Sequence, residues 1–492
     1  MSVELIASRI TAPIVGSSVF TWTSIIGIIL FGISLGSYAG GKIIDRNPAD
    51  KTVFYISLFA SLFISSIPLL TKIAAPIIFW EIGLIFKILI LAALLFLAPA
   101  FFLGMIYPTM LKLYLNKTEK AGEAAGLLSG LGAIGSILGT FLTGFFFVGF
   151  VGSSLSLYLL SAILLISSFL LFEKNKKNIL FWLALGIIAI LIFAGGFFRD
   201  ANAKTIFESE SDYYKIKITE NEVGGVPARI LFLDFDSHSA ESLTQEKIGI
   251  YPETAPLLKA FKNNPDNVLV IGGGSYNLPK SMANIFNAKT DVVEIDPAVT
   301  EAAKIYFNLN KYPIRTINTD GRVYLSASKE KYDIIFGDAF NSFISIPWYL
   351  ATEEANLSAK ARLNPEGIYV LNFLSTLENE GGYWFQSVAK TFSQVFPNYY
   401  ILHMVKDKNE LQNVMLVGIN SEKQIPRENI LKAIGDLSVE SNFKLNLVLE
   451  NPVEKFSEKA VVLKDDFAPA ERLTLPLIKD YFNKYANWFY SL

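Results

Sequence analysis

Long stretches without charged residues constrain this chain more than any other feature. No Asp, Glu, Lys or Arg occurs in the segments 10–41, 52–71, 88–111, 124–172 and 178–198. A helix needs about 20 apolar residues to cross a bilayer. Five runs of this length and purity favour membrane-spanning helices over a buried helical core. We therefore expect an all-α transmembrane domain in residues 1–200, with the lipid bilayer as its partner.

The runs divide into about six spans. The longest run contains a Gly- and Ser-rich break at 149–154 and is predicted to form two helices. The expected spans are 18–40, 53–70, 88–108, 124–148, 154–172 and 179–198. Basic residues follow the first, third and fifth spans, which predicts that these loops are cytoplasmic. A sixth crossing would carry the soluble part outward, which is awkward for chemistry with a cytosolic nucleotide, so the side of the cell membrane on which it lies stays open.

Glycines recur four residues apart in two of these spans. Gly32, Gly36 and Gly40 share a helix face, and the pairs Gly126/Gly130 and Gly135/Gly139 repeat the spacing. Such faces let helices pack closely in lipid. The middle of each span contains no carboxylate, Lys or His, where an ion-coupled transporter usually has one. A packing role is therefore favoured over a substrate path.

Composition excludes several classes of function. The net charge of −2 gives no field for nucleic-acid binding. The chain has no cysteine, which excludes disulfides, thiolate nucleophiles and Cys-ligated metal sites. No metal site is predicted.

After residue 205 the pattern changes to that of a soluble protein. Polar and apolar residues alternate in 213–219, a Gly–Gly turn follows, and an apolar run fills 230–235, so a small β-hairpin domain is expected in 205–260. In 261–492, short apolar strands alternate with helical segments. The expected strands are 268–271, 291–295, 314–317, 332–337 and 367–372. This alternation predicts an α/β fold with a doubly wound parallel sheet.

Two strand ends mark a nucleotide site in this second domain. The first strand runs into Gly272-Gly273-Gly274-Ser275, where glycines allow a sharp turn and close approach of a ligand. Glu294 ends the next strand, where a carboxylate can accept hydrogen bonds from ribose hydroxyls. Residue 277 is Asn rather than Gly, so the full dinucleotide fingerprint is absent. A nucleoside without pyrophosphate fits better.

These motifs resemble the spermidine synthase (polyamine aminopropyltransferase) family. The similarity rests on Val268–Gly274, Val292-Val-Glu-Ile-Asp-Pro, Thr319-Asp-Gly-Arg and Tyr332-Asp-Ile-Ile-Phe-Gly-Asp. A membrane-fused variant of the family is similar over nearly the whole chain. Its marks here are Glu4-Leu-Ile-Ala-Ser-Arg, Gly16–Ser24, Gly40-Gly-Lys-Ile-Ile-Asp-Arg, Leu233–Ser239 and Lys464–Glu471. In that variant a further helix commonly precedes the segment matching Met1.

The resemblance implies roles for individual residues. Glu294 would hold the ribose, Asp320 with Gly321 the adenine, and Asp338 would be the general base. The residues implied to line the acceptor side are Tyr213, Tyr214, Asn341, Asp465 and Asp466. Ser275 and Asn341 depart from the family, which usually has Asp at both positions, and this weakens the case for a diamine substrate. Simpler roles stay open beside these: Asp296, Asp320 and Asp338 could cap helices, and His238 and His403 could be structural.

The function implied is aminopropyl transfer from decarboxylated S-adenosylmethionine to a small-molecule amine, by a membrane-anchored enzyme. No permanently bound cofactor is expected, with decarboxylated S-adenosylmethionine or S-adenosylmethionine as co-substrate. The alternatives are an S-adenosylmethionine-dependent methyltransferase, a non-catalytic membrane-tethered nucleotide or polyamine sensor, and a transporter. A homodimer is left open by the sequence.

Overall fold

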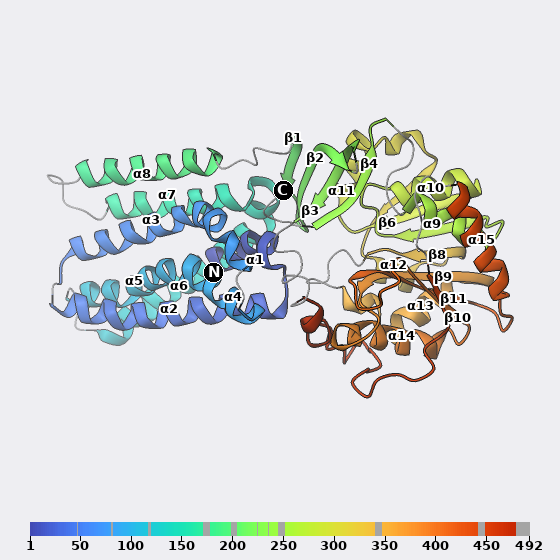
Figure 1. Cartoon of the computed structure of the whole chain (residues 1–492). Coiled ribbons are helices and arrows are strands. Elements are labelled where there is room, and N and C mark those ends of the chain that lie inside the picture. Colours follow the sequence, from blue (N-terminus) through green and yellow to red (C-terminus); the bar gives the residue numbers. More distant parts are fainter. Residues whose placement is uncertain are drawn as a thin grey trace. The chain divides into compact units, whose positions relative to one another are not determined.

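A computed structural model gives the arrangement of the chain (Figure 1). The residues it describes are 1–46, 48–79, 82–116, 120–170, 178–197, 204–223, 225–234, 236–244, 251–339, 347–440 and 448–478. The chain forms two compact units. The first contains residues 1–202 and 209–215, and the second contains 203–208 and 216–492.

The first unit is helical. Its helices are α1 (Ser2–Val15), α2 (Val19–Arg46), α3 (Asp50–Ala74), α4 (Leu84–Ala92), α5 (Ala98–Leu115), α6 (Ala121–Leu142), α7 (Ser153–Leu170) and α8 (Asn178–Phe197). Short 3-10 and π-helical turns follow α3, α4 and α6 at Ala75–Phe79, Ala93–Leu97 and Thr143–Val151. Helix α1 was not expected as a separate element. It ends at Gly16, whose φ of 70° breaks the helix before α2 begins.

Five stretches of helix within the described residues are long and apolar enough to cross a bilayer. They are Val19–Arg46, Lys51–Ile77, Leu84–Leu115, Ala121–Val148 and Ser153–Leu170. Each overlaps one of the first five spans expected from the sequence. The sixth expected span, 179–198, overlaps α8, in which Leu183–Ile192 counts as a shorter apolar segment.

The two sets of glycines in these helices have different surroundings. A Cβ on Gly36 would lie 1.9 Å from the Phe101 carbonyl oxygen, and one on Gly40 would lie 2.8 Å from Met105 Cα. The expected packing role is therefore confirmed for α2, which lies directly against α5. Within the described chain nothing lies within 4 Å of a Cβ on Gly126, Gly130 or Gly135, whereas a Cβ on Gly139 would lie 2.7 Å from Ser2 Oγ, so for the first three the packing role stays a prediction. Helix α6 belongs to a stretch that is only 11% buried.

Polar groups in the helical unit bind one another. Ser61 of α3 and Ser161 of α7 each donate to the other's carbonyl oxygen, at 2.9 and 2.8 Å. Glu210 accepts hydrogen bonds from the backbone N–H and the hydroxyl of Ser153 at 2.8 and 2.6 Å, where α7 begins. Arg9 donates to the carbonyl oxygens of Ser211 and Tyr213. These contacts hold the segment 209–215 against α1 and α7.

A four-stranded sheet lies mostly in the second unit. Its strands are β1 (Lys204–Glu210), β2 (Lys215–Val223), β3 (Val226–Leu233) and β4 (Asp236–Ser242), in that order. Strands β2 and β3 pair antiparallel, with Val223 opposite Val226, as the alternating pattern and the Gly–Gly turn predict. The expected hairpin is thus the centre of a larger sheet.

An eight-stranded sheet forms the rest of the second unit. Its order is β12-β10-β11-β9-β8-β5-β6-β7. The strands are β5 (Asn267–Ile271), β6 (Lys289–Glu294), β7 (Ile314–Asn318), β8 (Tyr332–Gly337), β9 (Leu363–Ser375), β10 (Tyr399–His403), β11 (Gln412–Ile419) and β12 (Val448–Glu450). The expected parallel sheet is confirmed for β5 to β9 but not beyond, because β10, β11 and β12 pair antiparallel. The sheet is therefore mixed.

Helices accompany the strands of this sheet. They are α9 (Tyr251–Leu258), α10 (Asn277–Phe286), α11 (Pro297–Tyr306), α12 (Gly321–Ala327), α13 (Glu353–Arg362), α14 (Tyr383–Val395) and α15 (Arg427–Glu440). Neighbouring residues of one strand enter opposite cores: Leu269 packs with Trp384 of α14, and Val268 with Met282 of α10. Burial on both faces explains why the central strands are apolar without alternation.

Candidate functional site

The order of the parallel strands places the candidate site. Strands β6 and β7 extend the sheet from one side of β5, while β8 and β9 extend it from the other. In sheets of this kind ligands bind outside the carboxyl ends of the strands, at the point where the order reverses. That point lies between β5 and β8, where the glycine-rich turn and Asp338 follow the two strands.

The glycine-rich turn is required by its backbone. Gly272 has a φ of 97°, and a Cβ there would lie 2.6 Å from the Asp338 carbonyl oxygen. The Asp338 N–H donates to the Ile271 carbonyl oxygen at 2.8 Å, which draws the end of β8 against this turn. Gly274 has a φ of 52°, with nothing within 4 Å of its Cβ position. The turn therefore lies directly against the backbone of the candidate base.

Glu294 binds the turn rather than projecting freely from β6. Its two carboxylate oxygens accept hydrogen bonds from the backbone N–H groups of Gly273 (2.7 Å) and Asp296 (2.9 Å). The residue is only 5% exposed, and this burial raises the pKa of its carboxyl above the usual range, against the opposing effect of the backbone hydrogen bonds. Each oxygen can accept a further hydrogen bond, so contact with ribose hydroxyls remains compatible with this geometry.

Asp320 begins α12 as its N-cap. One carboxylate oxygen accepts from the N–H groups of Arg322 (2.7 Å) and Val323 (3.0 Å), and the other accepts from the Tyr349 hydroxyl at 3.2 Å. Asp296 caps α11 in the same way through Ala298. The capping interpretation is confirmed for both residues, and an adenine contact by Asp320 and Gly321 stays a prediction.

Asp338 has a neighbour that the sequence did not reveal. Asn372, near the carboxyl end of β9, donates from Nδ2 to Asp338 Oδ1 at 2.7 Å. The register of the strands explains why Asp338 and Asn372 are in contact, because Gly337 lies opposite Leu371 in the parallel β8–β9 pair. A single Asn inside an apolar strand was the available signal. Ser275, next in the turn, is 1% exposed, and its hydroxyl oxygen has no hydrogen-bond partner in the described part of the chain.

The residues expected on the acceptor side belong to different parts of the chain. Tyr213 and Tyr214 lie in the segment that belongs to the helical unit, with Tyr213 43% exposed. Asp465 accepts from Arg322 Nη2 (2.8 Å) and the Thr352 hydroxyl (2.7 Å), so it ties the beginning of α12 to that of α13. Asp466 is exposed. Asn341 lies outside the described residues.

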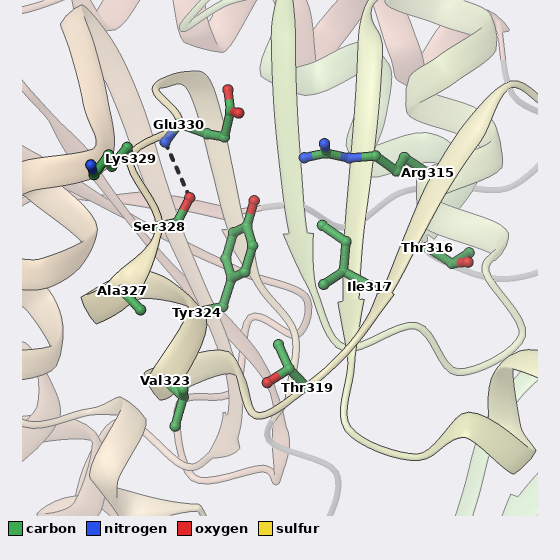
Figure 2. Close-up of a pocket in the computed structure, with 10 residues that line it drawn as sticks. All are labelled: Arg315, Thr316, Ile317, Thr319, Val323, Tyr324, Ala327, Ser328, Lys329 and Glu330. Atoms are coloured by element: carbon green, nitrogen blue, oxygen red, sulfur yellow. Dashed lines mark hydrogen bonds between the residues drawn. The ribbon is translucent and has the colours of Figure 1, made fainter.

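A cavity of about 580 Å³ lies elsewhere, along the edge strand β7 (Figure 2). Its lining comes from β7, from α12 and from the turn that follows α12. Arg315 in its wall is held by buried Asp291 through hydrogen bonds of 2.9 and 2.6 Å. Asp291 also accepts from the Tyr332 hydroxyl, which lies 2.6 Å from that of Tyr324. Thr319 in the lining precedes Asp320, but the glycine turn and Asp338 are not part of this cavity.

Both histidines have structural surroundings. His403 is fully buried, with Nδ1 2.9 Å from the Val405 carbonyl oxygen. Burial lowers the pKa of His238 to about 4, so its ring is neutral at physiological pH. No group of three or more His, Cys, Asp or Glu side chains among the described residues could hold a metal ion.

Comparison with known proteins points to one family. Residues 252–427 match the spermine/spermidine synthase domain. The polyamine aminopropyltransferase of Vibrio vulnificus (strain CMCP6) is 29% identical over 222 residues, which are 43% of this chain and 71% of the relative. Residues 252–427 are therefore a spermidine synthase-like domain. The matched residues contain the glycine turn, Glu294, Asp320 and Asp338, whereas Tyr213, Tyr214, Asp465 and Asp466 lie outside the matched range.

One further relative and one solved structure are also similar to this chain. The polyamine aminopropyltransferase of Leptospira interrogans serogroup Icterohaemorrhagiae serovar copenhageni (strain Fiocruz L1-130) is 24% identical over 415 residues, covering 77% of this chain and 78% of the relative. A probable spermidine synthase structure from Corynebacterium glutamicum ATCC 13032 has a TM-score of 0.44 and 17% identity, covering 54% of this chain and 98% of that one.

Proposed function

We propose that this chain is a membrane-anchored transferase that moves the aminopropyl group of decarboxylated S-adenosylmethionine to an amine. The observation that carries the proposal is the convergence of the glycine turn, Glu294 and Asp338 on the β5–β8 switch point. The relatives named polyamine aminopropyltransferase support the reaction class. Five apolar helices of sufficient length support the membrane anchor.

The reaction needs little beyond orientation and a base. The acceptor nitrogen attacks the aminopropyl carbon bonded to the sulfonium, the C–S bond breaks, and its electron pair goes to sulfur to give methylthioadenosine. The proton of the attacking nitrogen passes to a base. Asp338 ends β8 beside the glycine turn, where it can orient the amine and accept that proton. Glu294 holds the turn and the ribose, which fixes the donor for in-line attack.

The test is product analysis with the full chain in detergent or lipid. The protein is incubated with decarboxylated S-adenosylmethionine and a panel of mono- and diamines, and methylthioadenosine is measured. Amine-dependent release is expected. Absence of release with every amine would overturn the proposal. Formation of S-adenosylhomocysteine from S-adenosylmethionine would replace aminopropyl transfer with methyl transfer at the same site.

A further inference from the structure

Three side chains form a row at the edge of the sheet where the candidate site lies. Asp338 follows β8, Asn372 lies on β9 opposite Met415 of β11, and Asn413 lies on β11 opposite Leu374 of β9. Strand β11 runs antiparallel to β9, so its beginning meets the carboxyl ends of β8 and β9. The row therefore starts beside the glycine turn and continues away from the nucleotide half of the site. We call these residues the Asp338 row.

The contacts within the Asp338 row fix the orientation of the central amide. Asn372 Nδ2 lies 2.7 Å from Asp338 Oδ1 and 3.5 Å from Asn413 Oδ1. An amide nitrogen carries two donors, and its oxygen only accepts. A reversed Asn372 would place its oxygen against both of these oxygens, which is repulsive. Asn372 must therefore present its donor to the carboxylate.

The burial of Asn372 limits how far its contact with Asp338 can move. Asn372 is 4% exposed, and its strand is packed between the two cores of the domain. A buried side chain on a paired strand cannot follow a moving partner as an exposed one can. The hydrogen bond to a carboxylate is also stronger than one between neutral groups. Asn372 thus limits the positions that Asp338 Oδ1 can occupy.

We propose that Asn372 is a positioning residue that orients the Asp338 carboxylate toward the acceptor nitrogen. This inference rests on the proposed function and adds a residue to its machinery. Asn372 takes no part in bond making. It holds one carboxylate oxygen of the ionised base, so that proton acceptance by Asp338 occurs from a fixed geometry. The Oδ1 atom of Asn413 lies 3.5 Å from the same amide nitrogen and favours this orientation of Asn372.

The same strand pair supplies a matched control. Asn364 Nδ2 donates to Asp333 Oδ1 at 3.0 Å, again from β9 to β8, but at the opposite end of these strands. Asp333 also accepts from the N–H groups of Asp266 and Asn267. Replacing Asn364 with Ala removes the same kind of hydrogen bond between the same two strands, far from the glycine turn. This variant therefore measures how much activity is lost when a hydrogen bond between these strands is removed away from the site.

The experiment compares Asn372→Ala, Asn372→Asp and Asn364→Ala by kcat and KM with the full chain. Asn372→Ala is expected to lower kcat about 10- to 100-fold, because orientation of a catalytic group is lost, while the KM for the donor changes less than about 2-fold. Asn372→Asp keeps the size of the side chain but replaces the donor with a second carboxylate. It is expected to lower kcat at least as far. Asn364→Ala should lower the melting temperature but leave kcat unchanged.

Several outcomes would overturn the inference. If Asn372→Asp had the same kcat as the natural chain, the N–H donor of Asn372 would not be needed. The size of the side chain alone would then explain the activity. If Asn364→Ala lowered kcat as much as Asn372→Ala, the effect would be structural. If the natural chain released no methylthioadenosine, the proposed function would fail first. Calorimetry of amine binding to the methylthioadenosine complex then decides the inference separately, because equal amine affinity in Asn372→Ala and the natural chain would refute it.

Discussion

The glycine turn offers the sharpest quantitative test of the site, through two alanine substitutions one residue apart. Both Gly272 and Gly274 have a positive φ, of 97° and 52°. A non-glycine residue in the left-handed region costs about 1–2 kcal/mol. Gly274→Ala meets no atom within 4 Å, so it should cost only this amount. Gly272→Ala adds a Cβ that lies 2.6 Å from the carbonyl oxygen and 2.9 Å from the carbonyl carbon of Asp338.

The Gly272→Ala substitution must therefore move the backbone at Asp338. Contacts under 3.0 Å to backbone atoms cannot be relieved by a side-chain rotation, so β5 and β8 must separate at their ends. We expect a total cost of about 3–4 kcal/mol for Gly272→Ala, against about 1–2 kcal/mol for Gly274→Ala. Calorimetric unfolding and titration with methylthioadenosine measure the two effects. Equal losses of stability and of affinity in the two variants would refute the close approach of the turn to Asp338.

Three further predictions address single side chains. Asp338→Asn should lower turnover about 10²–10⁴-fold with little change in nucleotide affinity, measured by kinetics and calorimetry. Glu294 has a raised pKa, so between its ordinary and its raised value the folded state holds a proton that the unfolded state has lost, and stability should fall as pH rises through this window; Glu294→Gln should remove that slope from pH-dependent melting. Glu210→Gln should weaken the contact with Ser153 and destabilise the helical unit by about 1 kcal/mol, whereas the exposed control Asp212→Asn should have no effect on its melting temperature.

The sequence predicted the parts of the fold that repeat a local pattern. The uncharged runs, the strand–helix alternation and the hairpin at Val223 each depend on neighbouring residues, and each coincides with an observed element. The antiparallel strands β10 to β12 were not predicted. Their apolar residues are buried on both faces like those of the parallel strands, so composition does not reveal direction. Only the pairing of β11 with β9 does so.

The candidate site, too, could be predicted only where its residues belong to a local pattern. Strand ends with glycines or carboxylates could be recognised because the chemistry is visible in one short segment. Asn372 could not, because its role depends on the register of β8 and β9, which brings residues 34 positions apart into contact. Asp465 was expected near the acceptor, but its bond to Arg322 spans 143 positions and places it at the beginnings of two helices. Contacts of this range follow from tertiary packing rather than from local pattern.

The charges along the sheet edge suggest what kind of acceptor the proposed enzyme would take. On the nucleotide side, Glu294 is bound to backbone N–H groups and Asp320 caps a helix. On the other side, the Asp338 row contains one carboxylate and two neutral amides. A second ammonium group buried there would need a carboxylate of its own, because an unpaired buried charge is strongly unfavourable. Among the described residues, Glu378 after β9 and Glu450 of β12 both contact Lys408. Among the described residues, the Asp338 row thus offers one carboxylate for one cationic nitrogen, and the amine panel tests whether the proposed enzyme takes a monoamine or a diamine.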